Sequence, residues 1–395
     1  MPSPALTHTL EDANSLQQLA REASPVNEEI YPRLKASLRV LTRRDGTIYV
    51  GDARDGYILD AIPYRQILRL STGAHSHAFI ADQLDLSPSA LGHILHELTS
   101  LGVIENLASP SRTGQQHHLN ASERIESERS FITHRSIDGG QGELHARAAF
   151  QIEIRGDTRI ARNLLALLVG SGFTSTTIKV SPHDPTLLQA RDLNALSVTS
   201  EDLGKSKSLH HRDIARQNHL VMHNLATTDL RVVSGRGKQD LVVATSSASA
   251  EDIQEWQSEG VRHLAISEVI AQTIEISPVI EPGVGPCLRC ISLHRRDALP
   301  EDLSLLAAPQ SSGELPVVSA ALVASLLASK IANFAHRVHG AADIPGMEQS
   351  EELERYRRRS QVINLLDPSL TMEDRRWSFH PECGCVDVRR RAWPR

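Results

Sequence analysis

The four cysteines constrain the fold of this chain more than any other feature. They are the only cysteines among 395 residues, and they form two close pairs, Cys287 with Cys290 and Cys383 with Cys385. A C-x-x-C pair and a C-x-C pair can each supply two corners of a tetrahedron, which is the ligand arrangement of a structural Zn²⁺ site. Two disulfides or four unrelated thiols are the alternatives, and residues 1–9 lack the basic start and apolar run of a secretory signal that would favour disulfides. The pattern therefore predicts a zinc site with no open coordination position, which links the end of the chain to a larger domain.

Composition and charge are those of an ordinary globular protein. A length of 395 residues allows two domains, and 40% apolar with 23% charged residues is enough for a sizeable core. No run approaches the roughly 18 apolar residues of a membrane span, so we expect a cytoplasmic protein without a membrane segment. The net charge of −6 gives no general attraction for nucleic acid.

The first part of the chain predicts a mobile arm over residues 1–29 and a small α+β module over residues 30–107. Polarity alternates on both sides of Asp45-Gly46, which indicates a hairpin. Ser87 followed by Pro88 is a helix start signal. The order of a hairpin, three helices and a short strand is typical of a winged helix, with expected elements at 37–42, 47–50, 64–70, 78–84, 87–102 and 103–105.

Three functions are compatible with such a module. Binding of DNA would need basic residues on the helix after Ser87, but its exposed positions hold Ser, Gly, His, Glu and Thr without Arg or Lys. Binding of a peptide needs only an open strand edge, such as residues 38–42, to which an extended segment can add. A module that only packs against its neighbour is the third alternative. The sequence favours peptide binding over DNA binding.

Residues 108–147 are rich in Ser, Gly, His and Gln and predict a linker, followed by an α/β domain over residues 148–395. Strands and helices alternate in this domain, which is typical of a Rossmann-like, doubly wound parallel sheet. A helix over 317–332 is apolar nearly all round and should be buried against that sheet. The other expected elements are strands at 149–154, 177–180, 240–245 and 263–266 and helices at 160–168, 209–220 and 250–260.

The Cys-Leu-Arg-Cys segment from Cys287, the apolar helix after it and the His-Pro-Glu-Cys-Gly-Cys segment from His380 resemble the ThiF/MoeB/HesA family, the bacterial relatives of ubiquitin-activating enzymes. The chain is most similar to the ThiF-like, leader-peptide-binding members of azoline peptide pathways, which also carry an N-terminal winged-helix module. In active members the resemblance implies adenylation of a peptide or protein carboxylate with ATP and Mg²⁺. It also implies a homodimer and, in azoline pathways, a separate YcaO-type cyclodehydratase as partner.

The resemblance gives three candidate nucleotide-binding residues, Gly156, Asp202 and Lys207. Gly156 stands where the family has a glycine-rich turn, but it is the only glycine of its turn, and Asp157 follows it. Asp202 and Lys207 match a family Asp-x-Gly-x-x-Lys segment, in which the lysine lies beside the nucleotide. A lysine at a solvated helix start is the alternative interpretation of Lys207.

Two other family positions are changed. Ala195 stands where the family has an arginine that helps to bind the triphosphate, and Ser246 stands where it has an aspartate for Mg²⁺. We therefore expect a zinc-containing scaffold that binds a peptide or small protein and presents it to a modifying enzyme. An active adenylyltransferase and a winged-helix DNA-binding regulator are the alternative hypotheses.

Overall fold

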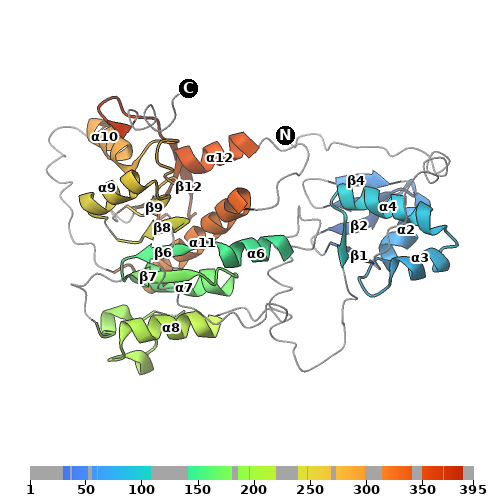
Figure 1. Cartoon of the computed structure of the whole chain (residues 1–395), viewed down its shortest axis with the longest axis horizontal. Helices are drawn as coiled ribbons and strands as arrows, with labels where there is room; N and C mark the ends of the chain where they lie inside the picture. The colour runs from blue at the N-terminus through green and yellow to red at the C-terminus, as the bar shows by residue number, and fades with distance from the viewer. Residues whose placement is uncertain are drawn as a thin grey trace. The chain divides into compact units, whose positions relative to one another are not determined.

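The chain, described here by a computed structural model, forms two compact units, Met1–Leu144 and His145–Arg395 (Figure 1). The predicted arm at 1–29 and most of the predicted linker at 108–147 lie outside the described residues. The structure describes residues 30–35, 38–51, 56–59, 61–107, 141–179, 186–194, 196–218, 239–246, 248–267, 273–298, 314–339, 349–367 and 369–385.

Among its described residues, the first unit contains two antiparallel sheets and the three helices α2, α3 and α4. Strands β2, β3 and β4 form one sheet in that order, and β1 pairs with β5. The predicted hairpin is confirmed as β2 and β3, and its turn is closed by the Arg43 amide, which donates to the Thr47 carbonyl at 2.9 Å. The elements are β1 (Tyr31–Leu34), β2 (Arg39–Thr42), β3 (Ile48–Gly51), β4 (Gly56–Leu59), α2 (Ala61–Leu70), α3 (His77–Gln83), α4 (Pro88–Ser100) and β5 (Ile104–Leu107).

The core of this unit joins β3 to the helices. The predicted start of α4 is confirmed, because the Ser87 hydroxyl accepts the Ala90 amide at 3.2 Å and Pro88 occupies the first turn. The apolar face of α4, made of Leu91, Ile94, Leu95 and Leu98, is buried in a cluster that includes Ile48 and Val50 of β3. By contrast, every residue of β2 is exposed.

The second unit is built on a parallel sheet in the order β7-β6-β8-β9. The prediction of an α/β fold with a parallel sheet is confirmed. After β6 the chain adds β7 on one side and then returns to add β8 on the other, so the strand order reverses direction between β6 and β8. The elements of this part are α6 (Gln141–Ala149), β6 (Ile152–Arg155), α7 (Arg159–Gly170), β7 (Thr176–Lys179), the short helices η1 (Ala190–Asp192) and η2 (Ser200–Asp202), α8 (Lys207–Asn218), β8 (Leu241–Ala244), α9 (Ala250–Glu259) and β9 (His263–Ala265).

Helix α7 lies between the parallel sheet and α8 (Figure 1), and it also packs against α11 (Val317–His339). The expected burial of this helix applies to one side only, since Val318, Ser325 and Ser329 are exposed. Its other side, including Val323 and Leu327, is buried in the core of the unit.

Among the described residues, one segment is long and apolar enough to cross a membrane by length and composition alone, the part of α11 from Val317 to His336. Its buried side packs in the protein core, which is where such a helix lies in a globular unit.

The described part of this unit also contains an antiparallel sheet with the order β10-β11-β12, which was not expected from the sequence. Its strands are β10 (Thr273–Ile276), β11 (Arg359–Asn364) and β12 (Met372–Arg376). Helix α10 (Leu288–Ala298) follows β10 in the chain, and α12 (Gln349–Arg358) directly precedes β11.

Candidate functional site

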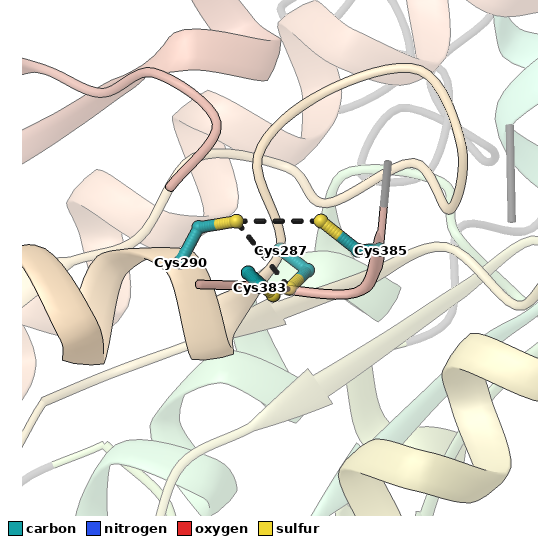
Figure 2. A group of neighbouring side chains, drawn as sticks. All are labelled: Cys287, Cys290, Cys383 and Cys385. Atoms are coloured by element: carbon teal, nitrogen blue, oxygen red, sulfur yellow. Dashed lines mark hydrogen bonds between the residues drawn. The ribbon is translucent and has the colours of Figure 1, made fainter. Parts of the chain in front are cut away.

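The four cysteines converge, as Figure 2 shows, with their side chains pointing toward one another. Cys290 lies in the first turn of α10 and Cys287 directly precedes that helix, whereas Cys383 and Cys385 lie in the segment after β12. All four sulfurs lie within 4.8 Å of one another, and all four residues are free thiols.

The spacing of the sulfurs suits a tetrahedral metal ion. Four sulfurs at about 2.3 Å from a central ion lie about 3.8 Å from one another. The Sγ atoms of Cys287 and Cys290 are 3.8 Å apart, those of Cys287 and Cys383 are 3.5 Å apart, and those of Cys290 and Cys385 are 3.3 Å apart. The cluster could therefore hold a metal ion.

Neighbouring groups fix the second cysteine pair. The His380 amide lies 3.4 Å from the Cys290 sulfur, and the His380 ring bonds to Asp297 of α10 at 2.7 Å. Trp377 is buried in the same cluster, and its indole N–H donates to the Ser360 hydroxyl at 2.8 Å. These contacts hold the segment after β12 against α10 and orient its two sulfurs.

A second group of interest lies where the strand order reverses, at the carboxyl ends of β6 and β8. Sheets of this kind place ligand sites at such an edge. Gly156 has a φ of +99°, and a Cβ there would lie 2.6 Å from the Ser246 hydroxyl. Thr158 caps α7 and donates to the Thr245 hydroxyl at 3.2 Å. This turn requires glycine for two reasons. The positive φ is unfavourable for other residues, and a Cβ would clash with the Ser246 side chain.

Buried charges surround the first turn of α7. Asp157 forms ion pairs with Arg162 and with Lys207, and all three side chains are at least 96% buried. Asp192 lies 2.9 Å from the Arg162 guanidinium and 3.7 Å from the Lys207 ammonium. The imidazole of His211 lies 3.5 Å from Asp157. Both cations are therefore neutralised by carboxylates of the same chain.

The environment of Asp157 favours its ionised form. Burial raises the pKa of the carboxyl, but the contact with His211 and the charges of Arg162 and Lys207 outweigh burial and hold that pKa well below its usual range. Asp157 is therefore a permanent negative charge at neutral pH.

The three residues predicted to bind nucleotide have different surroundings. Lys207 is not on a solvated helix start, because its side chain is buried against Asp157 and Asp192. Asp202 accepts the Thr199 amide at 2.8 Å and the Lys205 ammonium at 2.7 Å, and these hydrogen bonds lower its pKa. Gly156 and Lys207 are linked through Asp157, whereas Asp202 binds the turn before α8. Ala195 lies outside the described residues.

Arg162 and Glu314 also belong to this charged group, although no sequence motif pointed to them. Glu314 accepts the backbone amide of Arg159, the first residue of α7, at 3.0 Å, and lies 4.0 Å from the Arg162 guanidinium. Asp157 and Arg162 are five positions apart at the start of a predicted helix, and this spacing could have suggested an ion pair between them. No sequence pattern connects Glu314 with residues about 150 positions earlier.

The fold with its parallel sheet, reversal point, antiparallel sheet and four-cysteine cluster is similar to the folds of solved heterocyclases and of MccB from E. coli. The resemblance to such proteins is confirmed at the level of the fold. No family model matches the sequence, and no curated protein matches it.

The similar solved structures include two kinds of protein. The heterocyclase TruD is 14% identical with a TM-score of 0.54, over 90% of this chain and 43% of the heterocyclase chain. A heterocyclase in complex with substrate and cofactor is 14% identical with a TM-score of 0.57, over 91% of this chain and 39% of that chain. MccB of E. coli, solved with AMPCPP and MccA, is 13% identical with a TM-score of 0.57, over 90% of this chain and 99% of MccB. The chain thus spans less than half the length of the heterocyclases and nearly all of MccB.

Proposed function

We propose that this protein is a zinc-containing scaffold that binds a peptide or small protein and presents it to a separate modifying enzyme. In this proposal the first unit is a winged-helix peptide-binding module. The second is a Rossmann-like, ThiF-like domain whose adenylation site is degenerate.

The open edge of β2 is the observation that carries the peptide-binding proposal. Among the described residues, β2 has only β3 as a neighbouring strand. Val40 and Leu41 are 38% and 57% exposed, so the strand offers apolar side chains as well as backbone. An extended peptide can add to such an edge through main-chain hydrogen bonds and gain specificity from alternate side chains.

The register of the hairpin indicates which backbone groups face the open edge. The Arg43 amide bonds to Thr47, so Arg43 and Thr47 are a hydrogen-bonded pair, and Leu41 with Tyr49 is the next such pair. The alternation of an antiparallel ladder then turns the amide and carbonyl of Val40 outward. By the same alternation, the amide of Ile58 in β4 faces the opposite edge of the sheet.

Zinc is the metal that four thiolates at this spacing favour, since thiolate ligands in a closed tetrahedral set are typical of structural zinc sites. Cys287, Cys290, Cys383 and Cys385 would hold it. The bound ion would leave no open coordination position, so its role would be to stabilise the second unit.

The proposed loss of adenylation is supported by the charges around α7. Lys207, the best candidate for a phosphate contact, is already paired with Asp157 and Asp192. Ser246 offers a hydroxyl in place of a carboxylate for Mg²⁺. A chain of this kind needs a separate catalyst, and the heterocyclases of the same fold are more than twice as long as the matched region. A YcaO-type enzyme is the partner that the resemblance implies.

A peptide selection tests the proposal. The full chain is used to enrich a random 12-residue phage library, and the enriched peptide is then measured by fluorescence anisotropy. Val40→Pro removes the outward amide without removing a ladder hydrogen bond, so the peptide should bind at least about tenfold more weakly, a loss of roughly 1.4 kcal/mol.

Ile58→Pro is the matched control, because it makes the same change at the opposite edge of the same sheet. It should leave the affinity unchanged. Loss of affinity with Ile58→Pro alone would place the peptide on β4, and failure to enrich any peptide would reject the scaffold hypothesis.

A further inference from the structure

The first turn of α7 has the features of an anion-binding site. Helix N-termini present free backbone amides and a partial positive charge, and phosphate groups bind there in parallel α/β sheets. This N-terminus lies at the edge where the strand order reverses, and two buried cations, Arg162 and Lys207, lie beside it. The Nε atom of Arg162 is buried and has no hydrogen-bond partner among the described residues.

Two carboxylates of the chain itself, those of Asp157 and Glu314, lie at this helix end. Asp157 directly precedes the N-cap residue Thr158 and pairs with both cations. Glu314, from the segment before α11, accepts the free amide of the first helical residue. With Asp192, the group contains three carboxylates and two cations, an excess of one negative charge while His211 is neutral.

The segment that carries Glu314 is held in place by Arg159. Its guanidinium donates to the Leu315 carbonyl at 2.7 Å and to the Leu193 carbonyl at 2.9 Å. Glu314 is therefore held at the helix end by the Arg159 amide and, through the neighbouring Leu315 carbonyl, by the Arg159 guanidinium. Its side chain is 22% exposed, whereas that of Asp157 is 1% exposed, so Glu314 is the outer of the two carboxylates.

We propose that Asp157 and Glu314 act as an internal substitute for a phosphate ligand and keep a latent anion-binding site at the N-terminus of α7 closed. The ligand class of the latent site is a di- or polyphosphate, since the site combines backbone amides with two separate cations. This inference rests on the proposed loss of adenylation and names the residues that prevent phosphate from binding.

Restoring the site by substitution tests the inference. Asp157→Asn combined with Glu314→Gln keeps the size of both side chains and removes two negative charges, which leaves the group with one net positive charge. Binding of sodium pyrophosphate, without Mg²⁺, is measured by isothermal titration calorimetry on the full chain at low salt. We expect the double variant to bind pyrophosphate at least about tenfold more tightly than the wild type.

Two further variants keep the test decisive. Adding Lys207→Met to the double variant should abolish the gain, because a cation of the site is lost. If the double variant does not fold, Glu314→Gln alone, at the less buried position, should still bind pyrophosphate roughly threefold more tightly.

The inference is overturned if wild type and folded variants bind pyrophosphate equally, or if Lys207→Met leaves the gain intact. ATP–pyrophosphate exchange by the wild type would instead reject the proposed function, so the two failures are distinguishable.

Discussion

Lys330 of α11 is a buried lysine whose ammonium donates to the Ser277 carbonyl at 3.0 Å. Burial lowers its pKa to about 8, against the opposing charges of Asp374 and Glu275. In the unfolded chain the ordinary value of 10.5 applies. Between these two values the unfolded chain binds more protons than the folded one, so folding stability rises with pH in that window.

The pH dependence of unfolding should therefore differ between wild type and Lys330→Met. From pH 8 to pH 10.5 the wild type should gain stability relative to the variant, with a slope approaching about 1.4 kcal/mol per pH unit. Urea unfolding at several pH values measures this difference. If the stability of the wild type and that of the variant change with pH in the same way, the pKa of Lys330 is not lowered by folding.

Single residues differ in how far the sequence reveals their roles. The cysteine cluster was predictable because each pair is local and the chain has no other cysteine. The charged group around α7 was not, since Asp157 and Glu314 look like ordinary surface carboxylates until the fold brings them to one helix end.

At the scale of elements, the cysteine cluster joins α10 to the segment after β12. Cys383 is buried in a small core with Trp377 and Ile280, so its removal affects packing as well as any metal ligation.

We expect about one zinc ion per wild-type chain and less than one in Cys383→Ser. The free energy of unfolding of the variant should be lower by at least about 2 kcal/mol, because structural zinc contributes directly to folding. The variant should therefore unfold at a lower denaturant concentration. Metal analysis and denaturation together check both points. Ser378→Ala, in the same segment but without a ligand atom, is the control and should keep its zinc. A metal-free wild type with freely reacting thiols would refute the zinc site.

Elements were predictable where a local pattern determines them. The Asp-Gly turn and the Ser87 cap gave the hairpin and α4 correctly. β12 gave no pattern because four of its five residues are charged and all five are exposed, so it pairs with β11 without an apolar face. α11 was expected to be buried against the sheet, and one side of it is buried in the core with strand residues, whereas the side with Val318, Ser325 and Ser329 is exposed.

For the whole molecule, the fold is similar to that of solved heterocyclases and of MccB, and we propose that the buried charges at the sheet edge disfavour a nucleotide. The wild type should therefore show no ATP–pyrophosphate exchange above background with any enriched peptide, whereas the same peptide should bind. Exchange that depends on Lys207, tested with Lys207→Ala, would establish the active-adenylyltransferase alternative and reject the scaffold.

With the proposed metal bound, the cysteine cluster would also close a large loop of the chain. Cys287 and Cys383 are 96 positions apart, and α10, α11, α12 and the strands β11 and β12 all lie between them. With the proposed metal bound, a protease that cuts the backbone once inside this loop would leave two fragments that remain attached through the ion. Such a nicked protein would run as one species under native conditions and separate only when a chelator is added to the denatured sample.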